Sequence, residues 1–441
     1  MTEVFTNASL LDGTKGMKMQ RNMTVTVEDG IILSVSERNR TPGRNRTPGR
    51  KRVIDLGGRT ILPGLINMHC HLPGTGKPQK IDDGTAALIQ KQLANPVGRF
   101  IMKRMCMSSA RTELMSGATT IRTVGGLGTI DSVIRDEIES GRLTGPRILA
   151  GNEAVSVPGG HMAGTLAYIA HSDEEAVALV DRIAEGRPDL IKLMITGGTL
   201  DVKRVGEESR ILMPLSMVKA ACDEAHRLGY RVAAHVQGME GIRTALLGGV
   251  DTVEHGGDID DEIIALFRER NAALVSTLTV VAAMACLPLE LSHLTPLYRE
   301  SCRKLLSECI RGFRKAVKAG IPTGLGMDNG SPLITQYSTW RELYFFTRYI
   351  GTEPEYALHS ATLGAAEILG IDDVTGSVEA GKAADFVIVD GNPLEDFSVL
   401  SKPRMVVKNG RLFSRPYFRR YPVYDSLLDR VSEFDSEFLP H

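Results

Sequence analysis

Short apolar segments and amphipathic segments alternate along this chain between residues 61 and 370. Eight of the apolar segments read as β-strands, and helical stretches such as Asp173–Glu185 and Pro214–Leu228 lie between them. Because strands that alternate with helices pair in parallel, eight repeats predict a (β/α)8 TIM barrel. The predicted strands are Ile61–His69, Thr119–Val124, Arg147–Ala154, Leu190–Ile195, Arg231–Val236, Thr252–Glu254, Ala273–Thr279 and Pro322–Gly326.

Both ends of the chain carry strand patterns without helices between them. The predicted strands there are Val4–Ala8, Met23–Val27, Ile31–Val35, Arg52–Asp55, Ala384–Asp390 and Met405–Phe413. Because these ends flank the predicted barrel, we expect them to pair with each other in one small β-sandwich. The sequence therefore predicts an α/β protein in four parts, which are residues 1–60 (sandwich), 61–370 (barrel), 371–413 (sandwich) and 414–441 (tail).

The tail from Ser414 to His441 is rich in Tyr and Phe. Disordered tails rarely carry that many aromatic residues, so we expect it to pack on the body or on a neighbouring subunit of a homo-oligomer. A tandem copy, Arg38–Gly43 followed by Arg44–Gly49, reads as a solvated loop lengthened by duplication. No aromatic residues interrupt this basic repeat, which argues against a nucleic-acid site.

A net charge of −1 gives the chain no general attraction to nucleic acid or to an anionic membrane. No apolar run reaches transmembrane length, and the first residues lack a signal-peptide pattern. None of the six cysteines forms a Cys-x-x-Cys pair, so free buried thiols are expected. These features together predict a cytoplasmic protein.

Residues that can bind metal recur at the predicted strand ends. His69 and His71 flank Cys70 after the first strand, and since side chains alternate along a strand, both imidazoles face the same way. Catalytic groups of a (β/α)8 barrel collect at the carboxyl ends of its strands. Further candidates at such ends are Lys192, His235, His255 and Asp328, and five of the six side chains are direct Zn²⁺ ligands.

Each of these residues also has a structural interpretation. A His-x-His pair can be a hydrogen-bonded pair, and a lone histidine after a strand is usually a satisfied core residue. A buried Lys192 would need a carboxylate partner, because an unpaired ammonium in a low dielectric is strongly disfavoured. It is the ordered set over eight predicted strands that favours a metal-dependent hydrolase.

The sequence does not decide the roles of several other polar residues. Arg122 could bind a substrate carboxylate or a carboxylate within the barrel. Glu254 should face away from His255 and is expected to be structural. Substrate contacts and packing roles are both open for Gln237 and Tyr168. The histidines expected to be non-catalytic are His226, His293, His359 and His441.

The chain resembles the amidohydrolase superfamily over nearly its whole length. The segment Ile61–His71 is similar to that superfamily's first-strand signature, and Ser360–Ala366 with Gly376–Val387 resembles its C-terminal signature. The resemblance implies that His69, His71 and Asp328 bind a buried metal ion and that His235 and His255 bind a more exposed one. It also implies that Lys192 is N6-carboxylated and bridges two divalent ions, expected to be Zn²⁺.

Two loops suggest a branch within the superfamily. Gly159–Met162 and the segment Ile191–Gly198 resemble Xaa-Pro and Xaa-Arg/Lys dipeptidases and N-acyl-amino-acid hydrolases. Met327 and Asn329 depart from the commoner Gly-Thr-Asp-Ala pattern around Asp328. The resemblance implies metal-bridged hydroxide attack on the C–N amide bond of a small-molecule substrate. Asp328 would move the proton to the leaving nitrogen, and His161 could donate to the carbonyl oxygen.

Other reactions of the superfamily remain alternatives. These are hydrolysis of cyclic amides, aryl amides or carbamates, and mononuclear deamination. Deaminases usually lack the bridging lysine and carry a His-x-x-Glu motif, whereas Glu240 here lies five positions after His235. A non-enzymatic scaffold is disfavoured because such proteins typically lose metal ligands.

Overall fold

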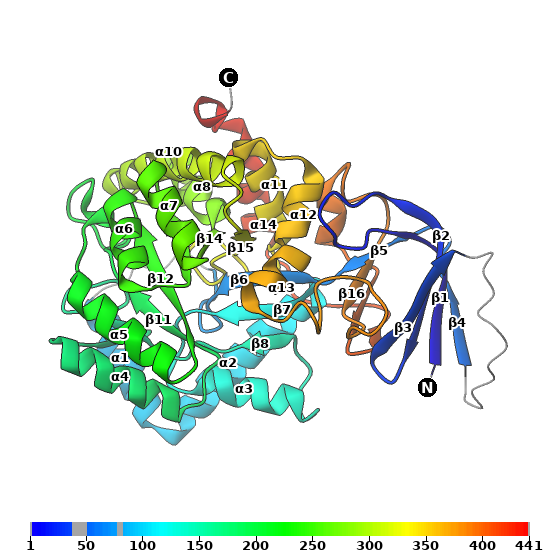
Figure 1. The fold of residues 1–441 in the computed structure, drawn as a ribbon, viewed down its shortest axis with the longest axis horizontal. Coiled ribbons are helices and arrows are strands. Elements are labelled where there is room, and N and C mark those ends of the chain that lie inside the picture. Colours follow the sequence, from blue (N-terminus) through cyan, green and yellow to red (C-terminus); the bar gives the residue numbers. More distant parts are fainter. Residues whose placement is uncertain (1, 38–50, 77–82, 440–441) are drawn as a thin grey trace.

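The computed structural model describes residues 2–37, 51–76 and 83–439, and Figure 1 shows the arrangement of their elements. The tandem repeat at residues 38–49 lies outside the described residues. Across the described part of the chain, no helix is both long and apolar enough to span a membrane. The fold is mixed α/β, with one sheet built from the two chain ends and two sheets of parallel strands.

Strands from both chain ends share an eight-stranded sheet, at the right of Figure 1. Its order is β18-β17-β16-β5-β1-β2-β3, with β4 paired to β1. The chain ends meet where β16 runs antiparallel to β5, and the rings of Phe5 and Phe386 pack edge to face there at 5.2 Å. The strands are β1 (Thr2–Leu10), β2 (Gln20–Glu28), β3 (Ile31–Glu37), β4 (Lys51–Asp55), β5 (Thr60–Pro63), β16 (Phe386–Val389), β17 (Met405–Lys408) and β18 (Arg411–Phe413).

The remaining strands form two parallel sheets of three and seven strands. Their orders are β6-β7-β8 and β10-β9-β11-β12-β13-β14-β15. An isolated parallel bridge between Cys70 and Asn329 joins the end of β6 to the turn after β15. The strands are β6 (Leu65–Cys70), β7 (Ala118–Thr123), β8 (Arg147–Leu149), β9 (Ala154–Ser156), β10 (Ala167–Ile169), β11 (Leu190–Met194), β12 (Arg231–Gln237), β13 (Thr252–Gly256), β14 (Ala273–Ser276) and β15 (Thr323–Leu325).

Helices lie between and around these strands, and four of those described begin at a residue whose side chain accepts a backbone N–H of the first turn. α4 has the predicted bounds because the Ser172 hydroxyl accepts the backbone N–H of Glu175. The helices are α1 (Asp83–Ala94), α2 (Pro96–Met115), α3 (Ile130–Glu139), α4 (Asp173–Glu185), α5 (Leu215–Arg227), α6 (Met239–Gly248), α7 (Asp261–Arg270), α8 (Leu278–Cys286), α9 (Leu289–Ser292), α10 (Pro296–Lys318), α11 (Trp340–Ile350), α12 (Pro354–Ser360), α13 (Leu363–Leu369) and α14 (Pro422–Asp429).

Several predicted strands are shorter or divided in the structure, and three of them show why. The predicted strand 61–69 breaks at Gly64, where a Cβ atom would lie 2.0 Å from the Thr119 hydroxyl, so the chain passes from β5 to β6. The predicted strand 147–154 divides into β8 and β9, which belong to different sheets. β14 ends at Ser276, since the Glu342 carboxylate accepts the backbone N–H groups of Leu278 and Thr279 and starts α8.

The aromatic C-terminal tail packs on the body of the chain. The Phe418 ring stacks on Tyr337 with centroids 5.2 Å apart. Farther on, both oxygens of the buried Asp435 carboxylate accept hydrogen bonds from Arg348, and the Tyr349 hydroxyl donates to Oδ2. This buried, paired carboxylate ties the end of the chain to α11.

A buried ion cluster connects the terminal sheet to β8. Lys408 Nζ lies 2.7 Å from Asp385 Oδ2, and Arg147 lies 3.5 Å from the same oxygen. Both Lys408 and Asp385 are almost wholly buried. Burial lowers the pKa of Lys408 to about 8, although the charge of Asp385 opposes that shift.

We expect the substitution Lys408→Met to lower the free energy of unfolding by about 3 kcal/mol, because it leaves a buried carboxylate without its main partner. Denaturant unfolding measures the loss, with the exposed Lys402→Met as the matched control. Equal stability of the two variants would contradict this role for the ion pair.

Candidate metal centre

The six predicted ligands line one cavity at the carboxyl ends of the parallel strands. His69 lies near the end of β6, and His71 follows directly after that strand. Lys192, His235 and His255 lie on β11, β12 and β13, and Asp328 follows β15. Residues from both parallel sheets therefore meet at a single place.

Two of these residues have a left-handed backbone. His255 has a φ of 69° and Asp328 a φ of 54°, a region that non-glycine residues seldom adopt. The turn at His255 interrupts the alternation of β13, so Glu254 and His255 both reach the cluster. The expectation that Glu254 faces away is therefore wrong, since Glu254 Oε2 lies 2.8 Å from His69 Nδ1.

Hydrogen bonds fix which nitrogen of each histidine faces the cavity. His71 Nδ1 donates to the carbonyl of Gly125 (2.9 Å), and His235 Nε2 donates to the carbonyl of Gly197 (2.8 Å). Because a carbonyl can only accept, these nitrogens carry the hydrogen. In the neutral rings, His71 Nε2 and His235 Nδ1 then keep their lone pairs. His69 is held in the same manner through its Nδ1 contact with Glu254.

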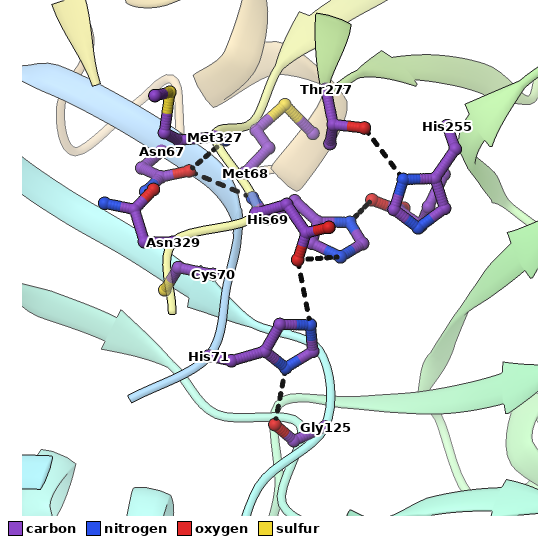
Figure 2. A network of polar contacts seen from close by, with 12 residues as sticks. Asn67, Met68, His69, Cys70, His71, Gly125, His255, Thr277, Met327 and Asn329 are labelled. Carbon is purple, nitrogen blue, oxygen red and sulfur yellow. Dashed lines mark hydrogen bonds and ion pairs between the residues drawn. The ribbon is translucent and has the colours of Figure 1, made fainter. Parts of the chain in front are cut away.

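The Nε2 atoms of His69 and His71, two residues labelled in Figure 2, both face the Asp328 carboxylate. His71 Nε2 lies 3.3 Å and His69 Nε2 3.7 Å from Asp328 Oδ1. Ligand atoms of His69, His255 and Asp328 all lie within 4.8 Å of one another. The tightest group thus includes His255, which was expected to serve the other ion.

Burial sets the charge of this cluster. It lowers the pKa of His69, His235 and His255 well below the usual value, and neighbouring cationic or imidazole groups lower it further. These rings are therefore neutral at pH 7. Burial alone would raise the pKa of Asp328, but the close contact with the His71 imidazole outweighs it and holds that pKa below its ordinary range.

Lys192 lies at the centre of the cluster with 1% of its surface exposed. Its Nζ atom has no hydrogen-bond partner among the described residues. Burial lowers the pKa of Lys192 to about 8, the charge of Arg122 lowers it further, and Glu254 and Asp328 oppose the shift. A buried amine without a partner, beside imidazole lone pairs and a carboxylate, fits the donor set of a divalent cation and an anionic form of this lysine.

His161 lies over this cavity, as the sequence suggested. Its ring stacks on His235 with centroids 4.1 Å apart, and its Nδ1 lies 2.5 Å from Asp201 Oδ2. The remaining wall is largely apolar and includes Met162, Met194, Leu200, Val280, Val281 and Met284. Gln237 also lines the cavity, and its buried Oε1 has no partner among the described residues.

The structure also shows where the polar residues of undecided role lie. Arg122 donates to Glu254 Oε1 at 2.7 Å, so its partner is a carboxylate of the chain itself. Tyr168 packs under the guanidinium of Arg182 and is not among the described residues that line the cavity. The helix and loop histidines His226, His293 and His359 also lie outside that lining, and His441 is beyond the described residues.

Several residues that contact the candidate ligands or their neighbours were not predicted from the sequence. Glu113 on α2 contacts Asn67 and Asn329, which flank the ligands. Thr277, whose hydroxyl lies 2.8 Å from His255 Nδ1, follows β14. No spacing rule links such positions to the site, because they come from helices and strands far apart in the chain.

Residues 60–413 match the model of the amidohydrolase family. The chain belongs to the amidohydrolase family. It is therefore a hydrolase of the amidohydrolase superfamily, a group that generally binds divalent metal ions. The resemblance identified from the first-strand and C-terminal segments is confirmed.

Relatives of this amidohydrolase have several specificities. Ochratoxinase of Aspergillus niger is 27% identical over 390 residues, which span 81% of this chain and 76% of the relative. A crystal structure from Bifidobacterium longum with a provisional prolidase assignment is 35% identical, with a TM-score of 0.84, covering 98% of this chain and 99% of the other. A Xaa-Pro dipeptidase structure with bound methionine is 28% identical, with a TM-score of 0.79, covering 94% and 100%.

Proposed function

We propose that this amidohydrolase is a binuclear metal-dependent enzyme that cleaves the C–N amide bond of dipeptides or N-acyl amino acids. Xaa-Pro dipeptides are the first class to test, because similar chains include an Xaa-Pro dipeptidase and a provisional prolidase. Xaa-Arg/Lys dipeptides are the second class, on the loop resemblance of Gly159–Met162 and Ile191–Gly198. The observation that carries the proposal is the convergence of anchored imidazoles and Asp328 around the unpartnered amine of Lys192.

For the ligands we propose the assignment that the family resemblance implies. His69, His71 and Asp328 would hold one ion, His235 and His255 the second, and Lys192 would bridge the two. The neutral amine of Lys192 can add CO2 to form a carbamate with release of one proton, which gives this side chain an anionic oxygen ligand. Divalent ions held there, expected to be Zn²⁺, would supply Lewis acidity and lower the pKa of water.

The chain's own groups perform the remaining steps. Asp328 accepts the proton of the attacking water and delivers it to the leaving nitrogen. His161 donates a hydrogen bond to the carbonyl oxygen as that oxygen gains charge, and Asp201 orients the imidazole through Nδ1. The apolar wall of α8 and the three methionines excludes water and accepts an apolar part of the substrate.

We also propose that the two parallel sheets are parts of one (β/α)8 barrel, with the terminal sheet forming a small β-sandwich beside it. The bridge between Cys70 and Asn329 supports closure between β6 and β15. In this arrangement the six ligands occupy the catalytic end of the barrel.

The test begins by removing bound metal with a chelator, reloading the protein with Zn²⁺ and measuring the number of ions bound per chain. Amino-acid release is then measured from Xaa-Pro dipeptides, Xaa-Arg/Lys dipeptides and N-acyl amino acids. We expect two ions per chain and strong release from one class. His71→Ala should lose both properties, whereas the control His226→Ala, a surface histidine paired with Asp251, should keep them. Protein that binds two ions but is silent on the whole panel would refute the dipeptidase and N-acyl proposals.

A further inference from the structure

Glu113 is a buried carboxyl group outside the cavity, on the last turns of α2. Three donors surround it. Asn329 Nδ2 donates to Oε1 at 2.6 Å, Asn67 Nδ2 donates to the same oxygen at 3.2 Å, and the Thr339 hydroxyl donates to Oε2 at 3.3 Å. The two asparagines also contact each other at 3.1 Å. One carboxyl group thus collects side chains from β6, from the turn after β15 and from the start of α11.

Each asparagine in turn holds backbone of the metal centre, as Figure 2 shows for Asn67. Asn67 Oδ1 accepts the backbone N–H of His69 at 3.2 Å and of Met327 at 3.0 Å. The backbone carbonyl of Asn329 accepts the N–H of His71 at 2.9 Å. The position of His69, His71 and Asp328 relative to one another therefore depends on two amides that share Glu113.

We propose that Glu113 is a positioning residue that fixes the geometry of the His69, His71 and Asp328 ligand set through Asn67 and Asn329. The inference rests on the proposed metal-dependent function. Asp328 has a left-handed backbone, so the turn that carries it needs support from outside its own strand. A network of this kind fixes geometry only if every member is satisfied, and Glu113 accepts the side-chain N–H of both asparagines.

Two substitutions of Glu113, one conservative and one disruptive, distinguish a role in positioning the ligands from a role in packing alone. Burial raises the pKa of Glu113 to about 8, against the hydrogen bonds from Thr339 and Asn67, so the group is mostly neutral at pH 7. Glu113→Gln keeps both shape and charge at that pH, whereas Glu113→Leu keeps only bulk. Leu114→Ala is the matched control, because Leu114 is equally buried on α2 but packs with Met115 and Val406.

The measurement is Zn²⁺ affinity by competition with a chelating dye, together with the unfolding midpoint. We expect Glu113→Leu to weaken affinity by about 10- to 100-fold and Glu113→Gln by less than about threefold. Leu114→Ala should lower the unfolding midpoint without changing affinity. The double variant Glu113→Leu/Asn329→Ala should bind metal no more weakly than the worse single variant, because both substitutions break the same link.

Four outcomes would overturn the proposal, and a fifth would refute the proposed function instead. Native affinity in Glu113→Leu, equal losses in Glu113→Leu and Glu113→Gln, or fully additive losses in the double variant would each exclude positioning through the asparagines. If Glu113→Leu fails to fold, Asn329→Ala tests the link from the other side, and unchanged affinity there overturns it. A wild-type chain that binds no metal would refute the proposed function rather than this inference.

Discussion

Replacement of Lys192 by alanine is expected to remove bound metal and to lower kcat/KM by at least about 10³-fold, which corresponds to about 4 kcal/mol of transition-state stabilisation. The reason is geometric as well as electrostatic. Lys192 lines the same cavity as five histidines and Asp328, and no described carboxylate besides Asp328 lines that cavity. Metal content by mass spectrometry and amide hydrolysis measure the two effects.

The chemistry of a carbamate provides a sharper test of the same residue. Formate or acetate can enter the space left by the Lys192→Ala substitution and supply the missing oxygens, so either acid should restore part of the metal content and activity. Labelling with ¹³CO2 should give a carbamate carbon signal in the wild type that the variant lacks. Lys219→Ala, a surface lysine paired with Asp223 on α5, is the control. Full metal content in Lys192→Ala would eliminate the bridging role.

The second large effect is expected for Asp328→Asn, which should lower kcat by about 10²- to 10⁴-fold. An amide at this position still presents an oxygen toward His69 and His71, but it cannot accept the proton of water and return it to nitrogen. The loss should therefore depend on the leaving group. It should be greatest for an amide and smaller for an activated ester of the same acyl group, because an ester oxygen leaves without a proton.

Steady-state kinetics on such a matched amide and ester pair test whether Asp328 transfers the proton. The exposed Asp372→Asn serves as the control and should behave as the wild type. An equal loss on both substrates would show that Asp328 acts only by holding metal. Loss of bound metal without any change in kcat for the fraction still loaded would do the same.

Much of this architecture follows from patterns of spacing. The parallel strands were predictable because buried strands and amphipathic helices alternate over some 300 residues, and the six candidate ligand positions were chosen by their place at predicted strand ends. The sheet of both chain ends was also foreseen, since strand patterns without helices appear on each side of the alternating region.

The errors arise where tertiary contacts override local periodicity. Gly64 divides a continuous apolar run because Thr119 occupies the space of its side chain, and no rule of hydrophobic pattern reports that contact. Glu254 and His255 both reach the cluster because the backbone at His255 turns left-handed, which breaks the alternation expected along the strand. Asn329 was noted only as a departure from a commoner pattern. In the structure its side chain donates a hydrogen bond to Glu113, which lies more than 200 residues earlier in the chain.

The pairing of β5 with β16 has a consequence for how the protein is made. Thr60–Pro63 lies immediately before the strand that carries His69, yet its partner Phe386–Val389 is synthesised more than 300 residues later. During translation this edge of β5 therefore stays without its strand partner until Phe386–Val389 has been synthesised. Contacts of such long sequence separation make folding slow. The terminal sheet therefore cannot be completed before Phe386–Val389 is synthesised, and until then the edge of β5 is exposed to pairing with other chains.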